Sequence, residues 1–245
     1  MPTSPLKYCE LKSGPETVRI PYEVHRRRGL RYLRVVVSDP TRVYLKVPYR
    51  VSEATALEFL RQQGAWVLQA MARLPVPEPL VDFLARQGWV SGGGRSWKVV
   101  LGERGGRAGF IQEEANGILH IRTNPALPIE RQLLRVLREF AAAVIPPRVF
   151  ALAEPHGLRP TKITVRDQRR RWGACTNRST LSLNWRLILL PPALHDHILF
   201  HELAHLRHLD HSVAFWNFLQ ELDPQTRRHD RALTRISSGL MGLGT

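Results

Sequence analysis

The chain has 245 residues, 43% of them hydrophobic, which is enough to bury a core in one large domain or two small ones. It contains no apolar run of about 18 residues, so we expect no membrane-spanning helix. The N-terminus lacks the apolar stretch of a secretory signal, so none is expected. Its two cysteines, Cys9 and Cys175, are far apart, which argues against a disulfide framework and indicates a reducing compartment, the cytoplasm.

The formal net charge is +15 at pH 7, and the excess of arginine and lysine is spread over both halves of the chain. A charge of this size attracts polyanions, so nucleic acid is a candidate partner through a diffuse basic surface. The alternative is a solvated, arginine-rich surface without a specific partner. We favour that alternative because no known nucleic-acid-binding motif accompanies the charge.

The N-terminal region, residues 1–79, is predicted to be β-β-α. Two alternating runs, 33–37 and 43–47, flank the turn sequence Ser-Asp-Pro-Thr and predict paired strands. A helix is expected after Ser52, a good N-cap, because apolar residues then recur every three to four positions. The proline-rich stretch 75–79 predicts a stiff connector at the end of the region.

Residues 80–124 are predicted to be a glycine-rich β connector made of short strands and turns. The three glycines at 92–94 are not a phosphate-binding loop, because no Gly-Lys-Ser/Thr sequence follows them. We expect a separate domain over 125–245. It begins with a long helical pattern that Pro146 and Pro147 are expected to kink or split, and two strands and two further helices follow.

A dense group of histidines begins in the first of these two helices, in the stretch HELAHLRHLDH (201–211). His201 and His205 are four residues apart, so a helix places both imidazoles on one face, where they can bind one metal ion. Glu202 can reach a water on the same metal and act as general base. His211 reaches that ion only if the helix ends first and the chain turns back. The sequence therefore predicts one Zn²⁺ held by the three histidines, with Glu202 as the catalytic residue.

Two other histidines compete as ligands. His197 lies one turn before His201, and His208 lies one turn after His205. We expect both to lie outside the ligand set, because the glutamate determines which pair of histidines brackets the water. Three imidazoles also suit several first-row metals, although zinc is the usual partner of the H-E-x-x-H motif.

The stretch 166–216 resembles the YgjP-like zinc metallopeptidases, also called the DUF45 family, which lie near the SprT-type minimal zincins. The family's motifs are an arginine, R-W-G-S-C, L-N-W-x-L, H-E-L-x-H-L and N-H-S-x-x-F-W. The matching residues are Arg166, Arg171, Trp172, Gly173, Cys175, Asn184, Trp185, Leu187, His201, Glu202, His205, His211, Ser212, Phe215 and Trp216. Ala174 and Asp210 depart from the usual Ser and Asn, and His208 stands where the related metzincins have Gly.

This resemblance implies an α+β fold, in which a β-rich N-terminal part precedes a zincin-like metallopeptidase domain with the H-E-x-x-H helix against a small sheet. It implies a peptide or protein substrate that is hydrolysed by a metal-activated water. The strand STLSLNWRL is then either an exposed edge strand to which the peptide adds or an ordinary core strand.

Arg171 and Asn184 are the candidate substrate-binding residues that the resemblance suggests. The arginines of RRRWGAC lie either near a developing oxyanion or in solvent, whereas Trp172 is expected to pack under the metal-binding helix. We interpret Cys175 as a small buried residue rather than an extra ligand. Met241, close to the C-terminus, has no predicted role.

Two other functions are considered. A metal-dependent hydrolase of nucleoside triphosphates would suit the positive charge, but no phosphate-cradling loop supports it. A zinc-containing nucleic-acid-associated protein without hydrolytic activity would have its metal closed by a fourth ligand, such as His208 or Asp210.

Overall fold

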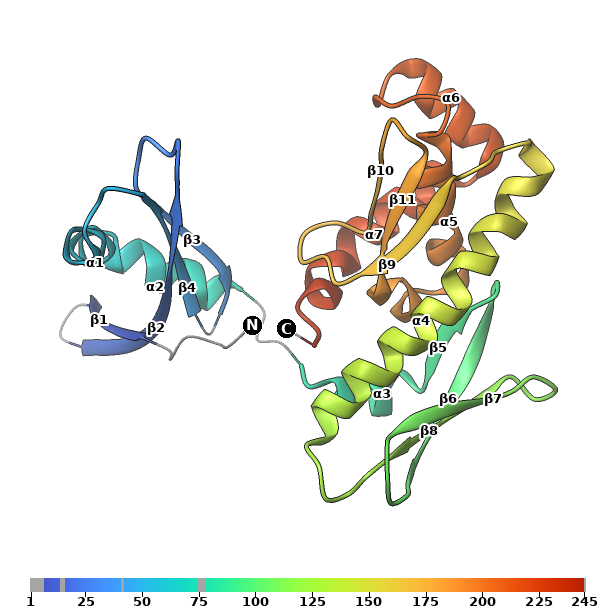
Figure 1. The fold of residues 1–245 in the computed structure, drawn as a ribbon, viewed down its shortest axis with the longest axis horizontal. Coiled ribbons are helices and arrows are strands. Elements are labelled where there is room, and N and C mark those ends of the chain that lie inside the picture. Colours follow the sequence, from blue (N-terminus) through green and yellow to red (C-terminus); the bar gives the residue numbers. More distant parts are fainter. Residues whose placement is uncertain (1–6, 14–15, 41, 75–77, 245) are drawn as a thin grey trace. The chain divides into compact units, whose positions relative to one another are not determined.

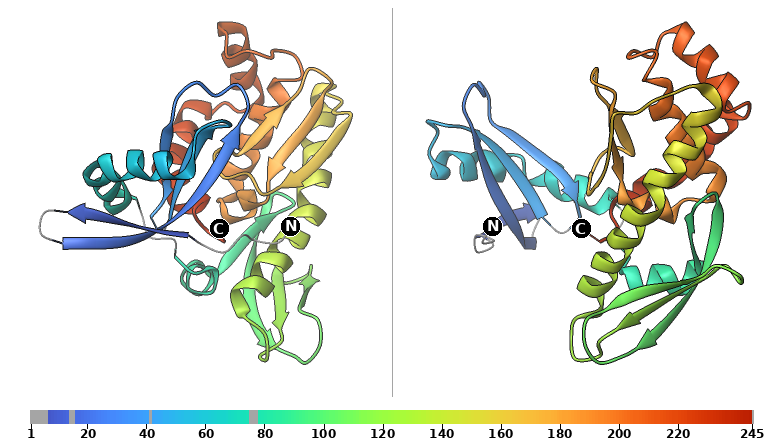
Figure 2. Two further views of the ribbon diagram at one scale, coloured as in Figure 1. Left: turned by 60° about the vertical axis from the view of Figure 1, so that its left-hand side comes forward. Right: turned by 45° about the vertical axis from the view of Figure 1, so that its right-hand side comes forward.

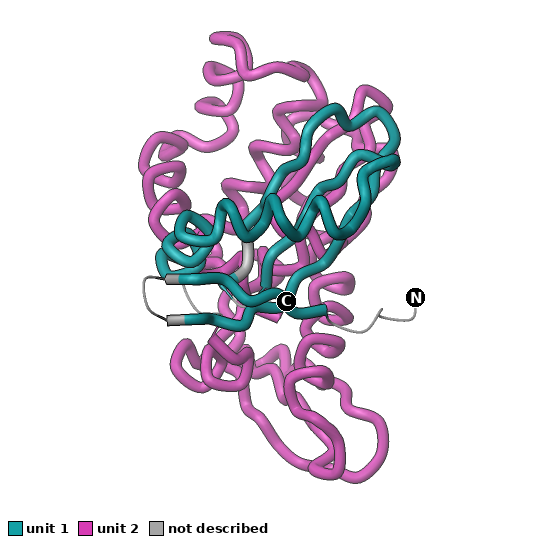
Figure 3. The backbone as a smooth tube through the Cα atoms, turned by 90° about the vertical axis from the view of Figure 1, so that its left-hand side faces the viewer, with its two compact units in different colours: residues 1–77 teal, residues 78–245 magenta. Residues whose placement is uncertain are grey.

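The chain divides into two compact units, residues 1–77 (unit 1) and 78–245 (unit 2), which are coloured separately in Figure 3. The computed structural model describes residues 7–13, 16–40, 42–74 and 78–244. Both units combine helices with small sheets, so the protein is α+β, as predicted. Most of the predicted connector 75–79 lies outside the described residues. Within the described residues, no helix combines the length and apolar character needed to cross a bilayer.

Unit 1 is a four-stranded sheet followed by two helices (Figure 1). Its strands, in the order β1-β2-β4-β3 across the sheet, are β1 (Lys7–Ser13), β2 (Glu16–Arg27), β4 (Arg42–Pro48) and β3 (Arg34–Asp39). Strands β3 and β4 form the predicted antiparallel pair. Apolar side chains of the sheet and helices, including Leu11, Leu45 and Leu60, form a core that belongs to this unit.

The helix predicted after Ser52 is present but interrupted. Ser52 caps α1 (Glu53–Gln62), and its Oγ accepts a hydrogen bond from the N–H of Thr55 at 3.1 Å. The helix breaks at Gln63, and a second helix, α2 (Gly64–Arg73), follows. Glycine has a low helix propensity, which favours an interruption beside Gly64.

Unit 2 contains the remaining elements. Its first part comprises α3 (Leu80–Gln87), β5 (Trp89–Gly92), β6 (Arg95–Glu103), β7 (Gly109–Glu113), β8 (Ile118–Thr123) and α4 (Ile129–Ala153). Its second part comprises η1 (Glu154–His156), β9 (Lys162–Arg166), β10 (Gly173–Cys175), β11 (Thr180–Asn184), η2 (Trp185–Leu189), α5 (Pro192–Ala204), α6 (Val213–Leu222) and α7 (Thr226–Met241). A single hydrophobic core runs through both parts.

Residues 80–124 are therefore part of unit 2 and not a connector between domains. Strands β5 to β8 form a sheet in the order β5-β6-β8-β7, and their buried residues Trp97, Leu119 and Ile121 belong to the same core as α4. Gly93 and Gly94 have φ angles of 64° and 82° and form the turn of the β5–β6 hairpin. The predicted glycine-rich turns are thus present, within a sheet that supports the long helix.

Helix α4 runs without interruption from Ile129 to Ala153, although a break was expected at Pro146 and Pro147. It packs against β5, β8 and β9, and it lies between the two sheets of unit 2 in Figures 1 and 2. Buried side chains precede and follow the two prolines. Packing on both sides of the helix compensates for the backbone hydrogen bonds that the prolines remove.

The three sheets share one strand connection. In each, a strand pairs in parallel with the strand after next, and the strand between them pairs antiparallel at the edge: β2/β4/β3, β6/β8/β7 and β9/β11/β10. A helix follows each set, namely α1, α4 and α5. The sequence has no repeat at a fixed period, yet this topology occurs three times, and the third occurrence leads into the helix with the histidines.

The strand predicted from STLSLNWRL becomes β11 and then the short helix η2. Strand β11 is the central strand of its sheet, since β9 pairs with one side and β10 with the other. Leu181 and Leu183 are fully buried. Of the two alternatives considered for this strand, the core strand is therefore correct, and the edge strands of this sheet are β10 and β9.

Candidate metal centre

Helix α5 carries the first two histidines of the cluster. It begins with Pro191 and Pro192, where a missing N–H costs nothing, and it buries Ile198, Leu199 and Leu203 in the core of unit 2. Fixing this apolar face determines where the other face points. The imidazoles of His201 and His205 consequently lie together, with ring centroids 5.0 Å apart.

The chain turns back directly after this pair, as the spacing to His211 requires. Helix α5 ends at Ala204, and a turn leads to the start of α6. Nδ1 of His205 donates to the backbone carbonyl of His208 at 2.9 Å. This hydrogen bond places the ring proton on Nδ1 and leaves the lone pair of Nε2 free to bind a metal.

The three histidines converge on one point. Each of His201, His205 and His211 offers a ring nitrogen within 4.8 Å of the others, and the Nε2 atoms of His201 and His211 are 3.2 Å apart. Two ligands of a tetrahedral ion with bonds of about 2.0–2.1 Å lie about 3.3 Å apart. The ring of Phe215 packs against all three imidazoles, and its centroid lies 4.5 to 5.0 Å from the centroid of each.

The protonation of these rings also suits a metal. Burial, and then the neighbouring histidines, lower the pKa of His201 to about 3. Burial lowers the pKa of His205 as well. Both imidazoles are therefore neutral near pH 7, which is the form that binds metal ions.

Glu202 is the buried acid of the site. Its side chain is nearly inaccessible, and Oε2 has no hydrogen-bond partner among the described residues. Burial raises the pKa of Glu202 to about 7, and the charge of Arg171 opposes this rise. A buried carboxyl oxygen without a protein partner, beside three convergent imidazoles, is expected where a metal ion and its bound water would complete the site. The donor set therefore fits a single divalent metal ion.

Gly173 makes room for this carboxyl group. A Cβ atom on Gly173 would lie 2.6 Å from the Cγ, Cδ and Oε1 atoms of Glu202, which is far inside van der Waals contact. The edge strand β10 therefore passes directly over the acid, and only glycine permits this approach.

A cleft of about 430 Å³ opens beside the metal ligands. His201 and Glu202 form its floor, together with residues of the loop before β10 and of α7. Trp172 contributes an apolar wall, packs against the core of unit 2, and donates from its indole N–H to Oγ of Ser237 at 3.0 Å. Trp172 thus packs against the core, and it joins the segment before β10 to α7.

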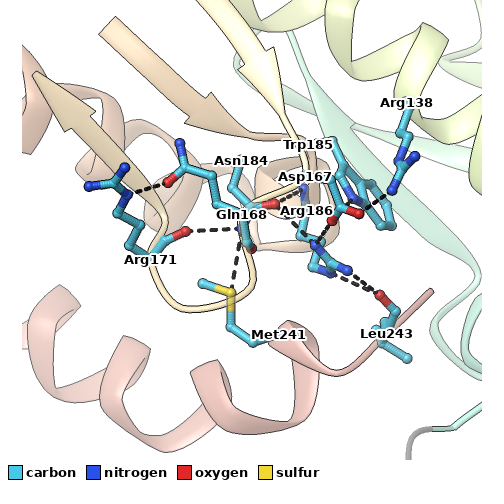
Figure 4. A network of polar contacts seen from close by, with 9 residues as sticks. All are labelled: Arg138, Asp167, Gln168, Arg171, Asn184, Trp185, Arg186, Met241 and Leu243. Carbon is cyan, nitrogen blue, oxygen red and sulfur yellow. Dashed lines mark hydrogen bonds and ion pairs between the residues drawn. The ribbon is translucent and has the colours of Figure 1, made fainter. Parts of the chain in front are cut away.

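The two candidate substrate-binding residues lie in different surroundings. Arg171 lines the cleft and is exposed, and its Nε donates to Oε1 of Gln168 at 2.8 Å. Asn184 has no exposed surface, so it is not placed to contact a substrate. Its side-chain amide donates to the backbone carbonyls of Gln168 and Arg171 and to the sulfur of Met241, as Figure 4 shows.

Asn184 is therefore a positioning residue for the loop that carries Arg171. A buried ion pair continues the same network, in which Arg186 donates to Oδ1 of Asp167 at 2.6 Å and to the carbonyl of Leu243 (Figure 4). Met241, for which the sequence suggested no role, takes part through its sulfur. No sequence pattern indicates the contacts of Asn184 with Met241 and of Arg186 with Leu243, because they join segments that are about 57 residues apart.

The remaining histidines and Cys175 do not join the three ligands. His197 bonds to Asp223 and Asp230 instead, and the ring of His208 lies against Phe218. Burial raises the pKa of Cys175 to about 11, so this residue is a neutral thiol and not a thiolate ligand.

Comparison with known proteins identifies the family of the chain. The model of the YgjP-like metallopeptidase domain matches residues 31–236, which is most of the chain. The fold and the convergent histidines are those of a metal-dependent peptidase. The chain belongs to the YgjP-like metallopeptidase family.

Among solved structures, the chain is similar to the metallopeptidase zymogen of Pyrococcus abyssi abylysin. The two are 26% identical over 36% of this chain and 95% of that chain, with a TM-score of 0.33. No curated protein matches the chain.

Proposed function

We propose that this protein is a zinc-dependent peptidase in which Glu202 is the general base. The observation that carries this proposal is the buried, unpartnered carboxyl group beside three convergent imidazoles at the floor of a cleft. A buried acid without a hydrogen bond destabilises the fold. Such an arrangement is typical of a residue retained for chemistry.

His201, His205 and His211 would hold the zinc ion. When bound, zinc supplies Lewis acidity toward a carbonyl group and lowers the pKa of water. Glu202 accepts the proton of the attacking water and delivers it to the leaving amine. A pKa of about 7 suits both transfers near neutral pH.

The edge strand β10 offers a place for the peptide backbone. It pairs with β11 on one side only, and Arg171 and Trp172 at its start line the cleft. A peptide that adds to the free edge as a further strand would run past Glu202. Arg171, whose charge lowers the pKa of Glu202, is then the candidate for stabilising a developing oxyanion.

The structure disfavours a closed, purely structural zinc site. Neither His208 nor Asp210 belongs to the group of ligand atoms around His201, and Asp210 accepts a hydrogen bond from the N–H of Ser212. Hydrolysis of nucleoside triphosphates is also less well supported. The cleft is lined by the acids Glu202 and Asp230, and Arg171 is its one cation among the described residues.

The test compares the two substrate classes on the full chain. The zinc-loaded protein is incubated with casein, followed by mass spectrometry, and with a panel of nucleoside triphosphates, followed by pyrophosphate detection. We expect casein to be cleaved, the activity to disappear with a chelator and to return with zinc, and the nucleotides to remain intact. Pyrophosphate release with uncleaved casein would contradict the proposal and support the nucleotide hydrolase.

A nucleic-acid partner is suggested by exposed residues of unit 1, namely Arg27, Arg28, Arg31 and Tyr32 at and after the end of β2, and Tyr49 after β4. Tyr32 and Tyr49 are 72% and 60% exposed, and the guanidinium of Arg28 lies 5.3 Å from the ring of Tyr49. Exposed arginines beside exposed aromatic rings suit single-stranded nucleic acid, because cations bind phosphates and rings stack on bases. These residues would give nucleic acid a local binding site in addition to the diffuse basic surface expected from composition.

Binding of a fluorescent single-stranded oligonucleotide tests this partner. We expect an affinity that falls steeply with salt and that drops for the double variant Arg28→Glu, Tyr49→Ala, but not for Arg104→Glu in unit 2. Equal binding by the wild type and both variants would contradict a local site and indicate binding through the diffuse basic surface alone.

The free thiols of Cys9 and Cys175, in separate units, support a reducing compartment such as the cytoplasm.

A further inference from the structure

A second cluster of titratable side chains lies one helical turn from the metal ligands. His197 is buried on α5, and a carboxylate oxygen faces each of its ring nitrogens. Nδ1 is 2.5 Å from Oδ2 of Asp223, and Nε2 is 3.1 Å from Oδ1 of Asp230. Nδ1 of His229 is 2.7 Å from the same oxygen of Asp223.

These distances identify a hydrogen-bonded network and not a second metal site. His197, Asp223 and His229 lie close enough together to suggest a ligand set. Two ligands of one tetrahedral ion would be about 3.3 Å apart, as the Nε2 atoms of His201 and His211 nearly are. Contacts of 2.5 and 2.7 Å are too short for this and match charge-assisted hydrogen bonds from imidazoles to a carboxylate.

The network fixes the carboxylate of Asp230 in the cleft beside the candidate metal ligands. Asp230 lines this cleft together with His201 and Glu202. His197 holds Oδ1 of Asp230, and Asp223 in turn fixes the ring of His197. Among the described residues, Oδ2 of Asp230 has no hydrogen-bond partner. The carboxylate is 40% exposed, so this oxygen is available to a ligand.

No other polar group on the α7 side of the cleft is equally available. The hydroxyl of Thr234 donates to the backbone carbonyl of Asp230, and that of Ser237 donates to the carbonyl of Leu233. The apolar side chains of Leu233 on α7, Ile198 on α5 and Trp216 on α6 also line the cleft. The wall therefore combines one fixed carboxylate with apolar surface.

We propose that Asp230 and the apolar wall around it form a subsite for a cationic group of the peptide substrate. This inference rests on the proposed peptidase function and names its substrate preference. A lysine or arginine side chain places an apolar stem on such a wall and its charge on the carboxylate. A free N-terminal amine offers the same charge. Arg171, which precedes β10, also lines the cleft, and its Nε donates to Gln168 rather than to Asp230.

The experiment uses peptides built around a bond that the protein cleaves in casein. The peptides differ at one residue near this bond, which is arginine, its neutral isostere citrulline, or glutamate. Each of the three peptides is made with a free and with an acetylated N-terminus. We expect kcat/KM to be at least tenfold higher for arginine than for citrulline, mainly through KM, as a charge-assisted hydrogen bond provides. If acetylation lowers kcat/KM and the exchange of arginine for citrulline does not, the cationic group bound by Asp230 is the N-terminal amine.

Variants of Asp230 assign the preference to this residue. Asp230→Asn should reduce the ratio of kcat/KM for the arginine peptide to kcat/KM for the citrulline peptide to within about twofold. Asp230→Lys should instead favour the glutamate peptide, a gain that misfolding does not produce. Glu221→Gln, the same charge change at an exposed position of α6, should leave the preference intact.

The outcomes separate this inference from the proposed function. Peptide cleavage with equal kcat/KM for arginine and citrulline, and for free and acetylated peptides, would overturn the subsite and leave the peptidase standing. A cationic preference that survives in Asp230→Asn would overturn it as well. If the wild-type protein cleaves no peptide or casein, both the subsite and the peptidase function are wrong.

Discussion

Gly173 and Glu202 show at the scale of single residues how closely the edge strand approaches the acid. Glu202 and the three histidines could be predicted from their spacing, because a helix and one turn back suffice to bring them together. The role of Gly173 could not, since it depends on β10 passing over α5. Asn184 was assigned to the substrate for the same reason, because its burial arises only when the loop before β10 folds against it.

Gly173→Ala tests this contact. The added Cβ must displace the carboxyl group of Glu202, so we expect kcat for casein to fall about 10²-fold while the protein still binds one zinc ion. Steady-state kinetics and metal analysis measure the two effects. Gly239→Ala, on α7 with open space around the added Cβ, is the matched control. Full activity in Gly173→Ala would show that Glu202 does not need its observed position.

The ion pair of Asp167 and Arg186 gives a prediction on pH and stability. Burial opposes the charge of Asp167, but hydrogen bonds and attraction from Arg186 outweigh it and hold the pKa below its usual range. Because the pKa of Asp167 is lower in the folded protein than in the unfolded chain, the ionised carboxylate stabilises the folded state above about pH 4. This contribution to the free energy of unfolding is lost as the pH falls further.

We expect Asp167→Asn to lower the free energy of unfolding by about 3 kcal/mol at pH 7, because Arg186 is fully buried and loses its partner. Urea unfolding from pH 7 to pH 3 measures the difference from wild type. This difference should shrink as the pH falls below about 4. A constant difference across this range would contradict the assigned pKa.

At the scale of elements, α5 and α6 follow from their high apolar content, whereas α7 and β10 do not. Helix α7 is rich in arginine, and the apolar residues that it buries are mainly Leu233 and Leu240, so its apolar content does not mark it as a core helix. Strand β10 has only three residues and exists because β11 offers a pairing edge. Both elements line the cleft, so the sequence predicted the metal ligands better than the walls around them.

Phe215 of α6 connects the packing of elements to metal binding. Its ring is fully buried against all three histidines, so we expect Phe215→Ala to cost about 3–5 kcal/mol of unfolding free energy and to weaken zinc binding. Denaturant unfolding and competition with a zinc chelator measure these effects. Val213→Ala on the same helix, where the side chain is 76% exposed, should change neither. Unchanged zinc affinity in Phe215→Ala would show that the rings hold their positions without it.

The whole molecule consists of two units with separate cores, and unit 2 contains every residue of the candidate site. Composition could suggest either one or two domains, but not that 80–124 joins the second. That placement depends on the long-range packing of β5 to β8 on α4. The strand connection that the three sheets share could not be predicted from the sequence either, because strands of different length and sequence can share one topology.

We expect a fragment of residues 78–245 to fold, to bind one zinc ion and to cleave casein, because its core and its ligands are its own. Circular dichroism, metal analysis and the casein assay are run beside the full chain. A folded fragment that binds zinc but does not cleave casein would show that unit 1 contributes to substrate binding. A fragment that does not fold would contradict the independence of the two cores.

The central claim is that three histidines hold a metal ion and Glu202 moves the proton. The most direct measurement determines metal content and casein hydrolysis together, on wild type and on Glu202→Gln, which keeps the shape of the side chain and removes its basicity. We predict about one zinc ion in both proteins and a loss of kcat of about 10²–10⁴-fold in the variant. Equal hydrolysis by both proteins would contradict the role of Glu202, and zinc-loaded proteins of which neither cleaves casein would contradict the peptidase.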